Sequence, residues 1–392
     1  MNEKKNVLIV HNCYQIPGGE DTVVKNEKLM LETYGNNVIL YTRNNNELKK
    51  NEYIKKIILP FITIFNIRTY FEIKHLIENE NIDIVHVHNT LNLISPSVYY
   101  AAVSCGVPVV QTIHNFRLLC PAATFYRDGH ICEDCLKKGL RCAVIHGCYR
   151  NNRFETLACV INTKLHRMTG IYKKINFICL TEFNKGKILE LKQIRKNKVF
   201  VKPNFVDNKK EIILNEKRKN QFVFVGRLDK LKGIDLLFKT WKQTEDGTGK
   251  LIVCGTGPME EWCKKFVDEN KINVELKGFI PNEEVRKIIA VSRALIFPTQ
   301  WYEGFPMNII EAYSVGTPVL GSNIGNTKNI IKEGITGMLF DDISELPNII
   351  RKLSFNMKIY ESTYRYYLEH YTMQVNFKKL KKIYEKVEDN RS

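Results

Sequence analysis

The sequence predicts an α/β protein made of two similar domains, each built on a parallel sheet that helices cover on both faces. Two observations support this fold class: short, fully apolar runs recur along the chain, and helical patterns separate them. The length of 392 residues suits two or three domains. With 44% hydrophobic and 26% charged residues, the composition argues against a disordered chain, a collagen and a polytopic membrane protein.

The first half begins with an apolar run at 7–10, followed by the loop Pro17-Gly18-Gly19. A helical pattern then runs from 20 to 34, and Gly35 is a suitable residue to end that helix. Further strands are expected at 38–41, 84–87, 107–113 and 177–180, with a helix at 97–103.

The second half repeats the pattern. Strands are expected at 222–225, 251–254, 274–276, 294–297 and 318–320, with helices at 233–241 and 259–269. The segment 202–210 contains Pro203 and paired lysines, so it is the expected domain junction.

Compartment and charge give broader expectations. Residues 1–6 are polar and the apolar run at 7–10 is too short for a signal-peptide core, so we expect a cytoplasmic protein with reduced cysteines. The longest apolar stretch, 57–65, contains Pro60 and is shorter than the roughly 20 residues that span a bilayer.

The formal net charge is +17, mostly in the first half. Such a surface suits nucleic acid, an anionic membrane or a phosphorylated ligand, and charge alone does not choose between them.

Two carboxylates stand eight residues apart in the second half, Glu303 and Glu311. Glu303 is expected in a loop, and a helix is expected to start near Met307, because Pro306 is tolerated at a first helical position. Gly304 allows a ligand close to the backbone, and the free amides of the helix start favour an anion such as phosphate. The two acids would then hold a sugar hydroxyl and a ribose diol. The alternative is a solvated helix with incidental acids.

Arg227 and Lys232 follow the expected strand at 222–225. A planar guanidinium and a compact ammonium can together neutralise a diphosphate, although both could simply be surface residues of a turn. The nearby turn 255–258 lacks the full glycine spacing of a dinucleotide fingerprint, so NAD binding is not predicted.

Three histidines lie at or after expected strands. His86 and His88 are interpreted as packed or hydrogen-bonded imidazoles near a strand end. His114 follows the strand at 107–113, at a carboxyl edge of the sheet, where open α/β folds bind ligands.

Five cysteines crowd into one segment: Cys120, Cys132, Cys135, Cys142 and Cys148. Cys132 and Cys135 form a CxxC knuckle, and four thiolates hold Zn²⁺ tetrahedrally. This segment offers few large apolar residues, so we expect a structural zinc held by four of the five cysteines, with His130 and His146 as substitute ligands. The alternative is a set of reduced, unligated thiols.

The residues match a known family. The sequence contains, in order, Pro17-Gly18-Gly19-Glu20, Gly226-Arg227-Leu228 with Lys232-Gly233, and Glu303-Gly304-Phe305 with Glu311-Ala312. This set resembles the family 4 retaining glycosyltransferases, and the segments 83–89, 114–121 and 203–206 are also similar. The resemblance covers nearly the whole chain. It implies the GT-B fold, in which two Rossmann-like domains face each other across a cleft.

The resemblance also implies domain ranges. They are an acceptor-side domain at 1–204 with a Cys-rich insertion at about 120–148, a nucleotide-sugar-binding domain at 205–370, and a final helix at 371–392 that crosses back to the first domain.

The resemblance assigns roles to single residues. Arg227 and Lys232 would bind the donor diphosphate, Glu311 the ribose, and Glu303 the donor sugar near the reacting carbon. His114 would lie near the sugar. Gly18 and Gly19 would let the first-domain loop close on the donor. Backbone amides of Gly304, Phe305 and Met307 would meet sugar and phosphate oxygens.

The partners implied are a nucleotide-sugar donor and a glycan or lipid-linked acceptor in bacterial surface polysaccharide synthesis, such as capsule or lipopolysaccharide. The inner face of the cell membrane is a candidate surface for peripheral binding. No cofactor is expected for catalysis, because the family's donor sites generally lack an Asp-x-Asp metal motif.

Two alternative functions are an epimerase of nucleotide sugars with the same architecture and a zinc-stapled nucleic-acid-binding protein. The second lacks any recognisable nucleic-acid motif, so nucleic acid is not an expected partner.

Overall fold

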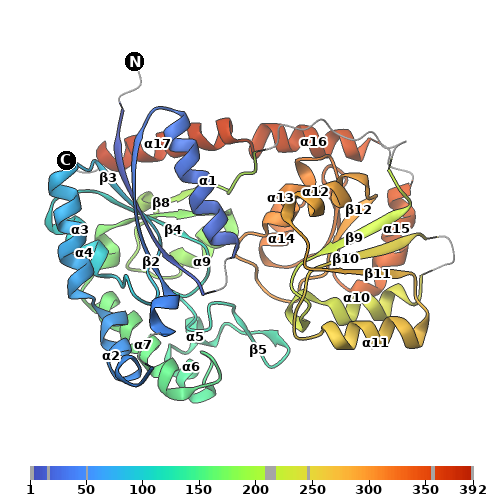
Figure 1. Ribbon diagram of the computed structural model, residues 1–392, viewed down its shortest axis with the longest axis horizontal. Helices are drawn as coiled ribbons and strands as arrows, with labels where there is room; N and C mark the ends of the chain where they lie inside the picture. Colours follow the sequence, from blue (N-terminus) through green and yellow to red (C-terminus); the bar gives the residue numbers. More distant parts are fainter. Residues whose placement is uncertain are drawn as a thin grey trace. The chain divides into compact units, whose positions relative to one another are not determined.

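The computed structural model describes residues 4–15, 18–49, 52–207, 218–244, 248–354 and 358–389. The chain forms two compact units. The first comprises residues 1–127, 132–204 and 376–392, and the second comprises 128–131 and 205–375. Each unit carries its own six-stranded sheet with helices around it (Figure 1).

The sheet of the first unit has the strand order β2-β1-β3-β4-β7-β8, and every neighbouring pair is parallel. Its strands are β1 (Asn6–Cys13), β2 (Asn37–Asn44), β3 (Ile84–Asn89), β4 (Val109–Ile113), β7 (Asn176–Cys179) and β8 (Val199–Val201). Its helices are α1 (Gly19–Thr33), α2 (Glu52–Ile64), α3 (Ile67–Asn79), α4 (Ser97–Ser104), α5 (Asp134–Lys137), α6 (Arg141–His146), α7 (Arg153–Met168), α8 (Ile171–Lys174) and α9 (Glu182–Leu189). A short two-stranded sheet consists of β5 (Tyr126–Arg127) and β6 (His130–Ile131).

The sheet of the second unit has the order β11-β10-β9-β12-β13-β14, again all parallel. Its strands are β9 (Gln221–Val225), β10 (Lys250–Cys254), β11 (Val274–Gly278), β12 (Ala294–Phe297), β13 (Val319–Ser322) and β14 (Gly337–Phe340). Its helices are α10 (Ile234–Trp241), α11 (Glu260–Asn270), α12 (Asn282–Val291), α13 (Met307–Tyr313), α14 (Gly325–Ile330), α15 (Leu346–Ser354) and α16 (Ile359–His370). Two Rossmann-like α/β units are thus confirmed.

The strands expected from apolar runs are confirmed, and most of these runs are buried, whereas β2 and β11 are only partly buried. Leu8, Val85 and Leu295 are fully buried, for example. Two edge strands, β8 and β14, were not expected. They have only three and four residues, and β14 begins with a glycine, so neither has the length of a recognisable apolar run. The apolar stretch around Pro60 is helical and belongs to α2.

The last helix, α17 (Met373–Asp389), joins the first unit through its residues from 376 onward. Phe377 stacks on Tyr34 with ring centroids 4.0 Å apart, and Glu388 pairs with Lys5 at 2.8 Å. The chain therefore passes between units at 127–128, 131–132, 204–205 and 375–376. The expected junction segment 202–210 extends from 208 onward beyond the described residues.

A buried ion pair lies in the first unit. Lys202 and Glu27 are each 1% exposed, and Lys202 Nζ donates to Glu27 Oε2 over 2.8 Å. The same ammonium donates to Asn376 Oδ1 of α17 over 2.9 Å. Burial alone would raise the pKa of Glu27, but the Lys202 ammonium and His86 outweigh it and hold that pKa well below its usual range. The pair thus joins α1, the segment after β8 and α17.

We expect Lys202→Met to destabilise the protein strongly. The Glu27 carboxylate would stay buried without its cation, which costs about 3–5 kcal/mol. Urea unfolding measures the loss, and Glu27→Gln combined with Lys202→Met should recover part of it. Lys5→Met, which breaks a more exposed ion pair, serves as control and should cost less than about 1 kcal/mol. Equal costs for Lys202→Met and Lys5→Met would contradict the assignment.

Candidate functional site

The second unit has a natural ligand edge. Its strand order reverses between β9 and β12, and in open α/β sheets ligands bind outside the carboxyl ends of the strands at that point. The residues after β9 and β12 include Arg227, Lys232 and Glu303, three of the predicted site residues.

Glu303 is held by three donors. Its Oε1 atom accepts from Lys232 Nζ at 2.6 Å, Trp301 Nε1 at 2.8 Å and Thr299 Oγ1 at 3.1 Å. The residue is only 7% exposed, so its carboxylate is largely shielded from solvent. All three donors converge on Oε1, which leaves Oε2 as the oxygen that they do not engage.

A glycine brings Lys232 to this carboxylate. Gly233 has φ +70°, and a Cβ there would lie 2.0 Å from the Pro298 carbonyl oxygen. The turn after β9 can therefore approach the loop after β12 only with glycine at this position. The Asp229 side chain accepts from the Lys232 amide at 3.0 Å and holds the same turn.

Arg227 is placed differently from Lys232. Its side chain is 66% exposed, and its Nε atom lies 3.3 Å from Asp229 Oδ2. The structure thus brings Lys232 and Glu303 into one hydrogen-bonded cluster, whereas Arg227 stands at the surface of the same turn.

Glu311 lies on α13, which begins at Met307 as the sequence predicts. It is 9% exposed, and its Oε1 atom accepts from Asn282 Nδ2 at 2.9 Å. The predicted backbone contacts, Gly304, Phe305 and Met307, lie between Glu303 and Glu311. Asn326 Nδ2 fixes this loop by donating to the carbonyl oxygens of Glu303 at 2.5 Å and Gly304 at 2.7 Å.

Sequence reasoning missed four side chains of this cluster: Trp301, Thr299, Asn282 and Asn326. Trp301 and Thr299 immediately precede Glu303, and this proximity was the one available signal. Asn282 and Asn326 come from distant segments, and only the fold brings them to the carboxylates.

The first unit has an equivalent edge. Its strand order reverses between β1 and β3. A cavity of about 90 Å³ opens at the carboxyl ends of the neighbouring strands β3 and β4, and its lining includes His88, His114, Gln111 and Arg117. His88 Nδ1 and His114 Nε2 are 2.9 Å apart. Burial lowers the pKa of His114 well below its ordinary value, so its imidazole is neutral at pH 7.

The loop before α1 places Gly18 and Gly19 at this edge. The Gly18 amide donates to Asp21 Oδ2 at 2.7 Å. Gly18 has φ −130°, and a Cβ at either glycine would meet no atom within 4 Å. The described contacts therefore do not themselves require glycine at these positions. Pro17 lies outside the described residues.

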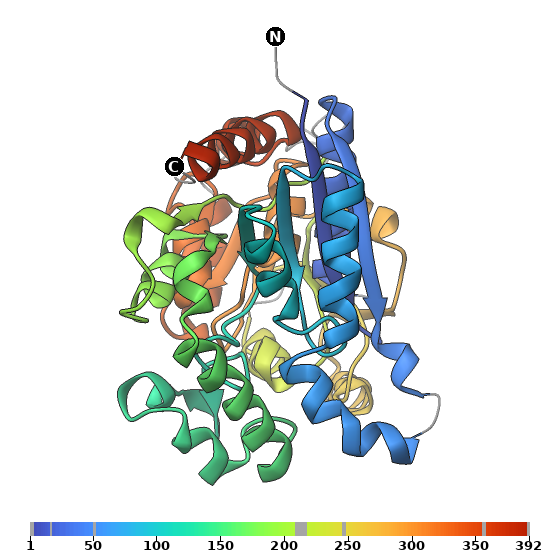
Figure 2. The same cartoon turned by 90° about the vertical axis from the view of Figure 1, so that its left-hand side faces the viewer.

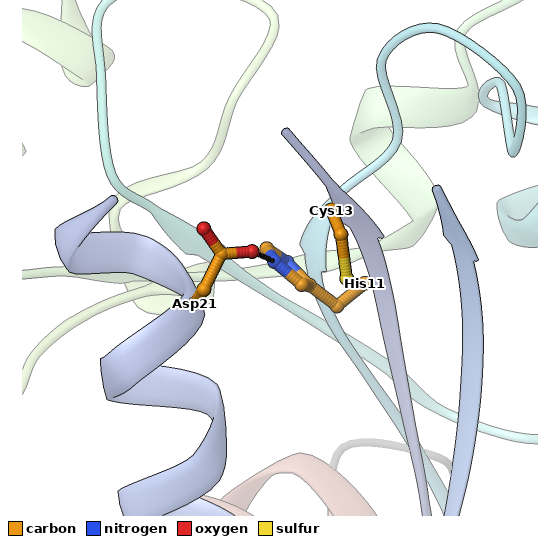
Figure 3. A group of neighbouring side chains, drawn as sticks. All are labelled: His11, Cys13 and Asp21. Carbon is orange, nitrogen blue, oxygen red and sulfur yellow. Dashed lines mark hydrogen bonds and ion pairs between the residues drawn. The ribbon is translucent and has the colours of Figure 1, made fainter. Parts of the chain in front are cut away.

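Figure 3 shows a group that the sequence did not predict, formed by His11, Cys13 and Asp21. His11 Nε2 donates to Asp21 Oδ1 at 2.9 Å, and its Nδ1 atom is buried without a hydrogen-bond partner. A metal bound at Nε2 would force the proton onto that unpartnered nitrogen, which is costly. The His11–Asp21 hydrogen bond therefore fits this geometry better than a metal does. Burial lowers the pKa of His11, so the ring is neutral.

Glu27, His86 and His88 also bring their ligand atoms together. A cation there would face the Lys202 ammonium, 2.8 Å from Glu27 Oε2. We therefore interpret this group as a hydrogen-bond network.

The Cys-rich insertion is ordered by packing. Contrary to the expectation of little core, Phe125, Leu140 and Ala143 are buried, and α6 packs on α7 (Figure 2). Cys135 and Cys148 pack against a small core formed by Leu140, Ala143 and Val160 of α7.

Four of the five thiols are electrostatic neighbours. Burial first, and then Cys120, Cys148 and Cys132, raise the pKa of Cys135 to about 12. Cys142 instead lies near Lys138, whose pKa is raised mainly by Asp134 and to a smaller extent by Cys142. Among the described residues, the groups of potential metal ligands within 4.8 Å of one another are the two discussed above, so the thiols do not form a closed ligand set here. Zinc binding stays a prediction.

Comparison with known proteins adds the following. The model of Glycosyltransferase Family 4 matches residues 17–210, and that of Glycosyl transferases group 1 matches residues 205–364. An uncharacterized 41.2 kDa protein in the cps region of Klebsiella pneumoniae is 30% identical over 137 residues, which are 34% of this chain and 37% of that protein. The UDP-Gal:alpha-D-GlcNAc-diphosphoundecaprenol alpha-1,3-galactosyltransferase of Escherichia coli is 25% identical over 309 residues, 74% of this chain and 70% of that protein.

Solved structures show the same fold. The lipopolysaccharide outer core galactosyltransferase WaaB has a TM-score of 0.67 at 18% identity, over 96% of this chain and 98% of that one. Anabaena HepE, in complex with UDP-glucose, has a TM-score of 0.63 at 14% identity, over 98% of this chain and 99% of that one. Both likenesses extend over nearly the whole chain, so the predicted GT-B fold with two Rossmann-like units is confirmed.

If zinc binds, about one ion per chain should be found in protein purified without chelators. Cys132→Ser and Cys135→Ser should each abolish it, because both thiols belong to the group of electrostatic neighbours. Cys142→Ser is the matched control and should keep the metal. Metal analysis that finds no zinc in the wild type would refute the prediction.

Proposed function

The chain belongs to the family 4 glycosyltransferases, and we propose that it transfers a sugar from a nucleotide-sugar donor to a lipid-linked glycan with retention of the anomeric configuration. The observation that carries the proposal is the Lys232–Glu303 pair at the carboxyl edge of the second sheet, with Glu311 on the helix that follows. This proposal fits bacterial surface polysaccharide synthesis.

The donor diphosphate would lie beside the turn after β9. A nucleoside diphosphate leaves with its charge exposed as the glycosidic bond breaks, and fixed cations at that position stabilise the departing group. Lys232 is pre-positioned by Gly233 and Asp229, while exposed Arg227 is free to turn toward a phosphate. HepE, which shares this fold, has been solved with UDP-glucose, which supports a donor of this class.

The two carboxylates would each bind a different part of the donor. The Glu303 Oε2 atom would accept from a hydroxyl of the donor sugar near its reacting carbon. Glu311 would accept from the ribose hydroxyls, with Asn282 holding one of its oxygens. Both groups are nearly buried, so hydrogen bonds to them are stronger than in water. Backbone amides of Gly304, Phe305 and Met307 would complete the contacts.

The acceptor would use the first unit, where His114 lines the cavity at the carboxyl edge of the sheet. The Escherichia coli relative is named for a diphosphoundecaprenol-linked acceptor. A lipid-linked substrate requires the enzyme to work at a membrane surface.

An exposed apolar stripe suits such a surface. On α7, exposed apolar side chains recur every three or four residues, so they form one face of the helix: Phe154, Leu157, Ile161, Leu165 and Met168. The neighbouring α2 and the turn after it add Ile58, Phe61 and Phe65. We call these eight residues the α2–α7 stripe.

Charges on the same elements suit an anionic surface. Arg150, Arg153 and Lys164 lie on or just before α7, and basic side chains attract anionic headgroups. The described residues contain no helix that is long and apolar enough to cross a bilayer. The exposed stripe and the basic side chains beside it support the proposal of peripheral membrane binding. Four further lysines precede the apolar stretch 57–65 in the sequence, Lys49, Lys50, Lys55 and Lys56, and their side chains lie outside the described part of the structure.

The first functional prediction separates binding from turnover. Glu311→Ala should weaken donor binding by one to two decades, since it removes a charge-assisted hydrogen bond worth about 1.5–3 kcal/mol. Lys232→Ala should instead lower turnover more than donor affinity, because the diphosphate charge grows in the transition state. Calorimetric titration and initial rates measure the two effects. A folded Glu311→Ala protein with unchanged donor affinity would reject the ribose role.

The second functional prediction concerns the membrane. Wild-type protein should sediment with anionic vesicles at low salt and be released at high salt. Phe61→Glu with Phe154→Glu should reduce sedimentation strongly. Phe279→Glu is the matched control, because Phe279 is 83% exposed on the second unit and lies outside the stripe. Absence of wild-type sedimentation at low salt would end the membrane proposal.

A further inference from the structure

A line of buried polar side chains runs from Lys202 to His114 within the first unit. Lys202 Nζ donates to Glu27 Oε2 at 2.8 Å. The other carboxylate oxygen, Oε1, lies 3.6 Å from His88 Nε2, and His88 Nδ1 lies 2.9 Å from His114 Nε2. Glu27, His88 and Lys202 are each at most 3% exposed. The line therefore connects a fixed charge to a ring that lines the cavity.

The charge of Glu27 decides which nitrogen of His88 carries the proton. A neutral imidazole has one N–H and one acceptor nitrogen. With its proton on Nε2, His88 directs an N–H dipole at the carboxylate. With its proton on Nδ1, a lone pair would face the carboxylate, which is repulsive. At 3.6 Å the contact with Glu27 is an electrostatic one, longer than a hydrogen bond, and His88 Nε2 is buried without a hydrogen-bond partner among the described residues. The proton therefore sits on Nε2, and Nδ1 is an acceptor.

The next contact then follows. A nitrogen–nitrogen distance of 2.9 Å requires one proton between the rings, and His88 Nδ1 has none. His114 must supply it from Nε2, so Nδ1 of His114 carries only a lone pair. Burial lowers the pKa of both rings, that of His88 to about 4, so both are neutral at pH 7.

We propose that Glu27 is a positioning residue: through His88 it fixes the tautomer of His114, so that Nδ1 of His114 accepts a hydrogen bond from a hydroxyl group in the cavity. This deepens the proposed function, since it rests on His114 as a sugar contact. The ligand class at this nitrogen is a hydroxyl donor, such as a sugar hydroxyl.

The other groups around His88 agree with this arrangement. His86 stacks on His88 with centroids 4.6 Å apart, and its Nδ1 lies 2.9 Å from Glu27 Oε1. Thr112 Oγ1 is 2.7 Å from His86 Nε2, within hydrogen-bond distance. Tyr384 of α17 places its hydroxyl 2.7 Å from His86 Nδ1, and neutral His11 lies edge-on to His88. The carboxylate is the only anion among these neighbours.

The variant Glu27→Gln should invert the line of tautomers. The Lys202 ammonium accepts nothing and needs an oxygen partner, so the glutamine carbonyl oxygen should face Lys202. Its amide group would then face the imidazoles and donate to His88 Nε2. His88 would carry its proton on Nδ1 and donate to His114, whose own proton would move to Nδ1.

Nitrogen-15 NMR of histidine-labelled protein reads these states directly. In the wild type we expect Nε2–H tautomers for His88 and His114, with a coupling across the hydrogen bond between His88 Nδ1 and His114 Nε2. In Glu27→Gln, the His114 proton should appear on Nδ1. Glu388→Gln is the control, because it breaks the Lys5 pair on the same unit and should leave the His114 spectrum unchanged.

Two results would overturn the proposal. One is a wild-type spectrum with the His114 proton on Nδ1, which needs no variant and so holds even if Glu27→Gln does not fold. The other is a folded Glu27→Gln protein with an unchanged His114 tautomer. Since the spectra need no substrate, their failure is distinct from failure of the proposed transferase reaction. If both proposals hold, Glu27→Gln should lower kcat/KM about tenfold, the effect of losing one hydrogen bond.

Discussion

The buried pair of Lys202 and Glu27 is the constraint on which much of the first unit depends. Neither charge is tolerable alone in a site with 1% exposure, so the segment after β8 and helix α1 must meet. Asn376 extends the pair to α17, which returns from the second unit, and His86 and His88 approach the same carboxylate from β3. Replacing the pair with apolar residues could keep the fold. It would remove the anion that orders the imidazoles beneath the cavity, and this gives a functional reason for keeping an expensive buried charge.

In the second unit, backbone geometry brings two oppositely charged side chains together. Gly233 lets two loops approach within a distance that any side chain would block, and this approach brings the Lys232 ammonium to the Glu303 carboxylate. Trp301 and Thr299 fill the remaining donor positions on one carboxylate oxygen. The result is a cation and an anion held in place before any ligand arrives, so little reorganisation is needed when charge develops on a leaving group.

The sequence predicted what local patterns control. Apolar runs located the central strands, Pro306 marked the start of α13, and the spacing of Glu303 and Glu311 pointed to the loop between β12 and α13, which we propose as the donor site. It did not reveal Asn282, Asn326 or the role of Glu27, because their partners lie far away along the chain and depend on the strand order. His88 was interpreted as a packed or hydrogen-bonded imidazole, and the structure adds that its hydrogen-bond partner is His114. The Cys-rich insertion has few apolar residues of its own, and the sequence did not show that α7 supplies the surface against which they pack.

The central claim is that this glycosyltransferase takes its sugar from a nucleotide-sugar donor. A thermal-shift series with UDP-, GDP-, ADP- and dTDP-sugars, with released nucleoside diphosphate monitored in the same samples, tests it most directly. Binding to the native state raises the melting temperature by mass action, so we predict that one nucleotide class stabilises the protein and is the class from which diphosphate is released. If none of these donors stabilises the protein and none is consumed, the claim is contradicted.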